Sequence, residues 1–193
     1  MTGSVTTAPR VSATPAGLLL AGFAAAVGVR VAVGGVGVSQ SPSAGLVFAG
    51  LLLALSATAR TRVPMSWRAT TLGLAGVVLL CLPVVLTRGD RPLHDATGFV
   101  PWALVVTVVA VAEEVFLRGA LYAAIDRVTG PTAAIVVTAA AFAALHVPLY
   151  GWQVVPLDLA VGVLLGELRR RSQTPLAPAI THVGADLAAW FLR

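Results

Sequence analysis

Two adjacent glutamates inside an apolar stretch are the residues of this chain best suited to chemistry. Glu113 and Glu114 lie in the apolar run 99–124, and Arg118 follows the second by four positions. A charged side chain at bilayer depth costs about 2.5–3.5 kcal/mol on insertion scales, so such residues usually face a functional polar cavity. In a helix, Glu114 and Arg118 share a face, whereas Glu113 points about 100° away. The spacing predicts one carboxylate held in an ion pair and a second, unpaired one that can act as a general base.

A structural ion pair that only fixes helix packing is the alternative interpretation of this segment. It accounts for Glu114 and Arg118, but an unpaired buried acid such as Glu113 adds nothing to packing. The second glutamate therefore favours a catalytic site.

Two later apolar spans carry histidines at matching spacing. Phe142 and His146 are four residues apart, as are His182 and Asp186, so each pair shares one helical face. A lone histidine in such a span is more often a hydrogen-bonded side chain than a catalytic one. Three helices with polar groups at membrane depth, however, are best accommodated if all of them face one shared cavity.

The chemistry of this set leaves two possibilities open. Glu113, His146, His182 and Asp186 could hold a divalent metal such as zinc. They could equally activate water and stabilise an oxyanion without any metal. The H-E-x-x-H signature of common zinc proteases is absent from the chain.

The composition predicts an integral membrane protein. Hydrophobic residues make up 58% of the chain and charged residues only 11%, with a mean hydropathy of +0.91. All 13 basic residues are arginines scattered over loops, so the net charge of +5 does not indicate nucleic-acid binding. The single cysteine, Cys81, excludes an internal disulfide and a cysteine-rich metal site. The expected partners are the lipid bilayer and a substrate, with no nucleic acid.

The pattern of apolar stretches predicts an all-α, polytopic transmembrane bundle with about seven spans. Residues 1–14 are polar and predict a disordered N-terminal tail, and residues 15–193 form a single transmembrane helical domain. Each stretch approaches the ~20 residues that cross a bilayer, although the sixth is short. The expected spans are 15–36, 44–59, 69–87, 99–124, 132–149, 154–168 and 176–192.

Arginine placement predicts the orientation of these spans. The loops expected at 60–68 and 169–175 hold three arginines each, whereas the intervening loops hold fewer. The positive-inside rule then puts the N-terminus in the cytoplasm. The expected location of the protein is the cell membrane. Among single residues, Arg30 is expected to snorkel to the headgroups, and Asp158 to cap the sixth helix or lie at its interface.

These motifs together resemble those of the CPBP intramembrane proteases, the group that contains the CAAX prenyl endopeptidases and bacteriocin-processing or immunity proteins. The resemblance covers residues 109–190 and rests on an ordered trio: Glu113-Glu114-x-x-x-Arg118, Phe142-x-x-x-His146 and His182-x-x-x-Asp186. The region from Gly162-x-x-x-Gly166 to Thr174-Pro-Leu-Ala-Pro178 is also similar. Asp186 stands where asparagine is common in the family.

The resemblance implies a hydrolase, an intramembrane endopeptidase whose site opens towards the cytoplasm. Glu113 would activate the attacking water with help from His146, while His182 and Asp186 would polarise the scissile carbonyl. Glu114 belongs to the site and pairs with Arg118. The family has been described both as metalloproteases and as metal-free glutamate enzymes, so zinc dependence stays open. A peptide or protein at the membrane is the expected substrate, and a non-catalytic immunity or peptide-binding protein is the alternative. A proton-coupled carrier is disfavoured because the chain shows no repeated halves.

Overall fold

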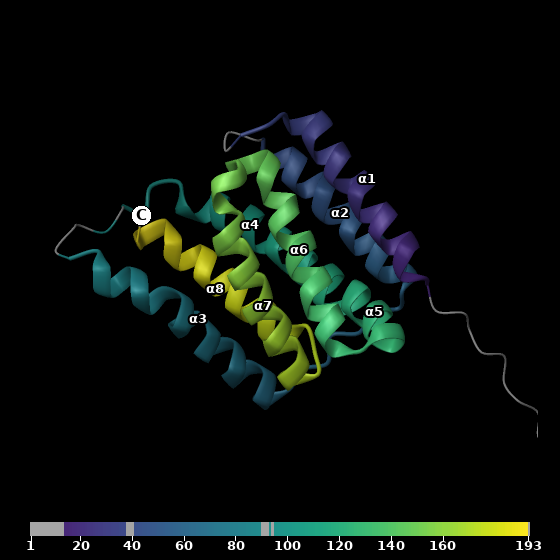
Figure 1. Ribbon diagram of the computed structural model, residues 1–193. Helices are drawn as coiled ribbons and strands as arrows, with labels where there is room; N and C mark the ends of the chain where they lie inside the picture. Colours follow the sequence, from purple (N-terminus) through teal and green to yellow (C-terminus); the bar gives the residue numbers. More distant parts are fainter. Residues whose placement is uncertain (1–13, 38–40, 90–92, 94, 193) are drawn as a thin grey trace, which may run out of the picture.

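The computed structural model describes residues 14–37, 41–89, 93 and 95–192, and every regular element among them is helical. The disordered tail predicted for residues 1–14 falls outside this part except for Thr14. The elements are α1 (Ala16–Gly34), α2 (Pro42–Thr58), α3 (Trp67–Thr87), α4 (Phe99–Glu114), the π-helix η1 (Val115–Leu121), α5 (Tyr122–Thr129), α6 (Pro131–Tyr150), the 3₁₀ turn η2 (Trp152–Val154), α7 (Val155–Ser172) and α8 (Leu176–Leu192). Because α4, η1 and α5 are continuous, the described chain forms the helical bundle predicted from its apolar stretches (Figure 1).

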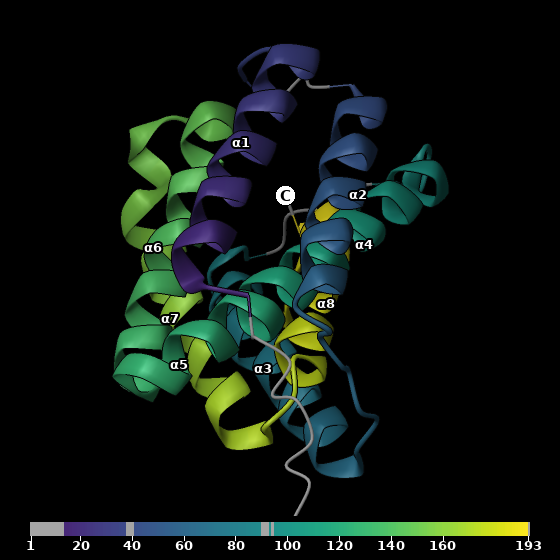
Figure 2. The ribbon, with the colours of Figure 1, turned by 90° about the vertical axis from the view of Figure 1, so that its right-hand side faces the viewer.

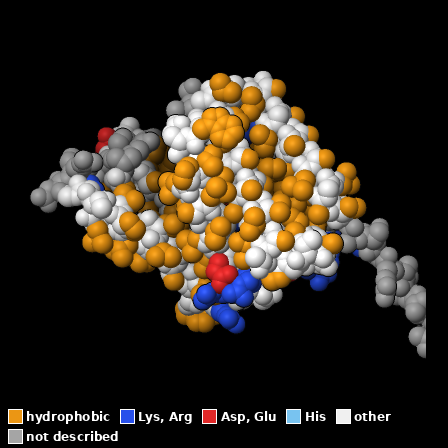
Figure 3. Space-filling model, viewed as in Figure 1, with side chains coloured by type: hydrophobic (Ala, Val, Ile, Leu, Met, Phe, Trp, Pro, Cys, Tyr) orange, Lys and Arg blue, Asp and Glu red, His pale blue; other side chains and the backbone are white. Residues whose placement is uncertain are grey.

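The lengths and compositions of the helices suit a bilayer. Among the described residues, α1, α3, the run Phe99–Thr129 and α6 are long and apolar enough to cross a membrane, while α2 and α8 are apolar but shorter. Large apolar side chains are exposed on the outer surface, as Figure 3 shows for one face. In water such a surface would be an aggregation liability, whereas in lipid it needs no cover. The chain is an integral membrane protein.

Glycines set the closest helix contacts. A side chain at Gly162 of α7 would meet the Ala139 backbone of α6 at 2.8 Å, and one at Gly76 of α3 would meet Thr181 of α8. Small residues at such crossings let helix backbones approach each other, which is how membrane helices associate. Gly162 therefore allows α7 to pack closely against α6. These contacts hold α6 to α7 and α3 to α8 (Figures 1 and 2).

The segment from α4 into η1 lies at the centre of the bundle. α4 contacts α2 and α8, and η1 contacts α1, α2 and α6. Six consecutive residues of η1, from Phe116 to Leu121, are buried. A π-helix is rare and occurs mostly at functional sites. The segment that carries the two adjacent glutamates, α4 continued by η1, thus also forms the core of the fold.

The helix boundaries differ from the predicted ones mainly at α5 and α7, because the predicted span 99–124 continues as helix to Thr129 and the predicted span 154–168 to Ser172. The three arginines at 169–171 were expected in a loop, but they continue the helix to Ser172. Glu167 explains the extension, because it accepts hydrogen bonds of 2.7 and 2.6 Å from Arg170 and Arg171 one turn later. Charged side chains consequently gather where α7 ends (Figure 3).

Candidate functional site

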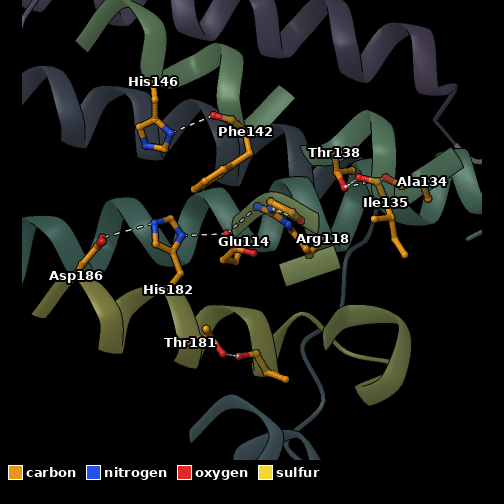
Figure 4. Close-up of polar contacts among 12 residues, drawn as sticks. Glu114, Arg118, Ala134, Ile135, Thr138, Phe142, His146, Thr181, His182 and Asp186 are labelled. Atoms are coloured by element: carbon orange, nitrogen blue, oxygen red, sulfur yellow. Dashed lines mark hydrogen bonds and ion pairs between the residues drawn. The ribbon is translucent and has the colours of Figure 1, made fainter. Parts of the chain in front are cut away.

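The two adjacent glutamates end α4 and are both buried, Glu113 at 2% and Glu114 at 0% exposure. Arg118 donates from Nη1 to Glu114 Oε1 at 2.8 Å, and its side chain is also fully buried. The ion pair predicted from the i, i+4 spacing is present (Figure 4). Glu113 points away from this pair, into a cavity described below.

Three further contacts hold Arg118 in place. Its Nη2 donates to the Gly162 carbonyl at 3.2 Å, and its guanidinium lies over the Phe142 ring, 4.8 Å from the centroid. Arg169 Nε donates to the Arg118 carbonyl at 2.7 Å, which satisfies a backbone acceptor in the π-helix. Arg118 therefore links η1 to α6 and α7, and it fixes Glu114 rigidly.

His182 of α8 extends the same network. Its Nδ1 lies 3.0 Å from Glu114 Oε1, the oxygen that also accepts from Arg118. Because an ionised carboxylate only accepts, Nδ1 is the donor. The other ring nitrogen, Nε2, lies 3.5 Å from Asp186 Oδ2 (Figure 4). The pairing of His182 with Asp186 follows the predicted spacing, whereas the Glu114–His182 contact joins separate helices and left no signal in the sequence.

His146 of α6 is held through its Nδ1 atom. That nitrogen lies 3.0 Å from the Phe142 carbonyl and 3.4 Å from Asp158 Oδ2. The Phe142 ring packs edge-on against both His146 and His182, at centroid distances of 4.6 and 5.3 Å. Nδ1 donates to these oxygens, and Nε2 is left as the lone-pair nitrogen. Asp158, expected only as a cap or interfacial residue, thus contacts a candidate site residue.

Arg30 corrects two sequence predictions. Its Nη1 lies 3.5 Å from Glu113 Oε1, and its guanidinium sits over the Phe48 ring at 4.7 Å. The side chain is only 13% exposed, so it points into the bundle and does not snorkel to the headgroups. Glu113, expected to be unpaired, has a cation beside it. Sequence position near a span end could not reveal this, because the packing of α1 against α2 decides which way residue 30 faces.

Apart from Glu114, the candidate site residues all line one cavity of about 520 Å³. Glu113, His146, His182 and Asp186 all face it, together with Arg30 and apolar side chains of α4 such as Val105, Val106 and Val109. A mostly apolar cavity with a few convergent polar groups is the usual form of a small-molecule or peptide site. The structure therefore brings together the residues that the three motifs singled out.

The cavity extends to one end of the bundle. Ser41, Gly98 and Tyr150 line it, and they flank the start of α2, the start of α4 and the end of α6. The arginine-rich segments lie at the opposite end, where Thr174 Oγ1 donates to the Pro64 carbonyl at 3.2 Å. The arginine-rich segments and the cavity opening were both predicted to face the cytoplasm, but they lie at opposite ends of the bundle. Only one of these two predictions can therefore be correct.

The donor set does not fit a metal site. Among the described residues, no group of three or more histidine, cysteine, aspartate or glutamate side chains could hold a metal ion. Glu114 is committed to Arg118 and His182, and Arg30 places a positive charge beside Glu113. A cation next to a would-be ligand opposes the binding of a second one. The metal interpretation gains no support from this geometry.

Comparison with known proteins gives one match. The family described as type II CAAX prenyl endopeptidase Rce1-like matches residues 95–188, which span α4 to α8 and contain all three motifs. No curated protein and no solved structure matches the chain. α1 to α3, including Arg30, lie outside the matched segment. The match over residues 95–188 supports the resemblance of this integral membrane protein to the CPBP family of CAAX-type proteases, which its motifs predicted.

Proposed function

We propose that this protein is an intramembrane endopeptidase that hydrolyses a peptide bond with water activated by Glu113. The observation that carries the proposal is the shared cavity, which gathers Glu113, His146, His182 and Asp186 from three helices. A purely structural ion pair needs only Glu114 and Arg118, and it would not need the other four groups to face a hollow.

The first step is the activation of water. Glu113 removes a proton from a water molecule in the cavity, and His146 assists through Nε2, the ring nitrogen that is not engaged by Phe142 and Asp158. The hydroxide attacks the scissile carbonyl carbon. The proton held by Glu113 then passes to the leaving amine, so the carboxylate is restored at the end of the cycle.

The second requirement is stabilisation of the tetrahedral oxyanion. Glu114 holds the His182 ring by Nδ1–H, and in the imidazolium form, which the carboxylates of Glu114 and Asp186 favour, the ring also carries Nε2–H in a fixed direction and can donate it to the oxyanion. Asp186 lies 3.5 Å from this nitrogen. An aspartate donates a hydrogen bond only when protonated, so the ionised form acts through His182 by favouring its Nε2–H. Here the chain departs from the asparagine that is common in the family.

The substrate is a peptide or protein in or at the bilayer, because the cavity is apolar and lies within the helical bundle. From the arginine bias we further propose that the N-terminus is cytoplasmic and that the protein resides in the cell membrane. No step of the mechanism is assigned to a metal, since the donor set does not fit one.

Glu113→Gln tests the proposal against a non-catalytic immunity or peptide-binding role. The amide keeps the shape of the side chain but cannot accept the proton, so cleavage of membrane peptides by the purified, reconstituted protein should be abolished. Glu167→Gln is the matched control, since it makes the same change at an ion pair on α7 that lines neither cavity. Substantial cleavage by Glu113→Gln would refute the general-base role, and wild-type protein that binds peptides but cleaves none would support the binding role.

A further inference from the structure

A second hollow of about 460 Å³ adjoins the cavity that contains Glu113. Four side chains line both spaces: His146, Tyr150, His182 and Asp186. Glu113 lines only the first. The candidate oxyanion groups therefore stand on the wall between two spaces, one bounded by α1, α2 and α4 and the other by α3 and α7.

Apart from that shared wall and Asp158, the second hollow is apolar. Its remaining lining consists of Leu80, Cys81 and Val84 of α3, Phe142 of α6, Leu157 and Val161 of α7, and Ala185, Ala189 and Leu192 of α8. Val84 is 44% and Leu157 66% exposed, so the space is open to the lipid-facing surface between α3 and α7. We call it the α3–α7 groove; Figures 1 and 3 show this face, on which apolar side chains predominate.

We propose that the α3–α7 groove binds an apolar side chain of the peptide substrate beside the scissile bond. The inference rests on the proposed function, because it takes the shared wall as the place of cleavage. An extended peptide advances about 3.3 Å per residue, so a chain that crosses His182 and Asp186 has its neighbouring residues in the two adjoining spaces. The groove is within the size range of ligand pockets, and its few polar groups all lie at the site.

Cys81 provides a specific way to alter the groove. It is the only cysteine of the chain and it lines the groove on α3. Cys81→Phe would fill the space, and so would reaction of the folded wild type with benzyl methanethiosulfonate. Val78→Phe is the matched control, because Val78 lies on the same helix, is 61% exposed and lines neither hollow.

In the cleavage experiment, the reconstituted protein is incubated with a set of synthetic peptides. Each position of these peptides is varied among alanine, serine, leucine and phenylalanine. At one position beside the scissile bond, the unmodified protein should prefer leucine or phenylalanine to alanine. Filling the groove should lower this ratio of cleavage rates by at least about tenfold, since pocket contacts discriminate side chains to that extent. Val78→Phe should leave the preference unchanged. If filling the groove affects all peptides equally or none, the inference is wrong. Methyl methanethiosulfonate, which adds only a small group to Cys81 of the folded protein, is the control that separates crowding by the benzyl group from mere loss of the thiol.

A binding experiment separates this inference from the proposed function. In Glu113→Gln, the leucine- and phenylalanine-containing peptides should slow the reaction of Cys81 with N-ethylmaleimide at least threefold, whereas alanine and serine peptides should not. Protection without wild-type cleavage would support the groove and refute the protease. Cleavage by wild type without protection or side-chain preference would refute the groove alone. If neither cleavage nor protection is found, both proposals fail.

Discussion

Replacing Arg118 by alanine is expected to destabilise the bundle far more than Glu113→Gln does. The Arg118 side chain is fully buried, donates to Glu114 at 2.8 Å and to the Gly162 carbonyl at 3.2 Å, and covers the Phe142 ring. Its removal leaves Glu114 buried with only His182 as partner. Glu113→Gln removes only a 3.5 Å contact with Arg30, which is longer than a strong charge-assisted hydrogen bond, and it keeps the side-chain shape.

The size of the difference follows from the burial. Breaking a buried ion pair by removing one partner costs about 3–5 kcal/mol. A chain of this length shifts its Tm by about 2–4 °C per kcal/mol, so Arg118→Ala should lower the midpoint by about 6–20 °C. Removing both charges together, with Glu114→Gln and Arg118→Met, should cost less than Arg118→Ala alone, because no unpaired charge remains in the core.

The assay is thermal unfolding of the purified variants in one detergent at one scan rate, with the apparent midpoint as readout. Loss of activity cannot decide the matter, since Glu114 also positions His182 and both variants are expected to be inactive. Equal midpoints for Arg118→Ala and Glu113→Gln would refute the reasoning. So would a double variant that is less stable than Arg118→Ala, because it would mean that the unpaired charge of Glu114 is not the main cost of removing Arg118.

Three further predictions follow from the site. His182→Ala should lower kcat by about 10²–10³, the usual effect of removing one oxyanion donor, and a loss below tenfold in single-turnover measurements would contradict that role. Treatment with EDTA or 1,10-phenanthroline should leave cleavage within about twofold of the untreated rate, because the donor set does not fit a metal; inactivation that zinc reverses would contradict this. In a Cys81→Ala background, Arg62→Cys and Arg170→Cys should react with an impermeant maleimide only after the cytoplasmic face is exposed, and labelling from outside intact cells would overturn the proposed topology.

The sequence predicted best what a single helix determines. The bundle follows from stretches of apolar residues, and the Glu114–Arg118 pair follows from a spacing of four. His182 and Asp186 also share a face, as expected. Each of these depends on helix periodicity, which tertiary packing changes little.

Contacts between helices could not be predicted in the same way. A transmembrane helix is apolar all round, so its sequence does not mark the face that packs inward. The Glu114–His182 hydrogen bond joins residues 68 apart, and the contacts of Arg30 with Glu113 and of Asp158 with His146 likewise depend on how helices pack. The π-helical segment at Arg118 escaped prediction too, since its wider turn is set by the surroundings and has no residue signature.

The place where the cavity opens decides from which side water and substrate reach Glu113. Ser41, Gly98 and Tyr150 line the cavity at the arginine-poor end of the bundle. The positive-inside bias puts this end outside the cell, whereas the family resemblance puts the opening in the cytoplasm. The bias counts arginines in short loops, and here Arg169, Arg170 and Arg171 belong to the last turn of α7, where Arg169 is engaged with the Arg118 carbonyl. An arginine recruited to hold the core contributes less to orientation than a free loop arginine does, so the segment that leads into α3, with Arg60, Arg62 and Arg68, carries more of the predicted bias than the end of α7 does. Labelling of position 62 from the cytoplasm would assign the cavity to the outer side, and labelling from outside would assign it to the cytoplasm and invert the chain.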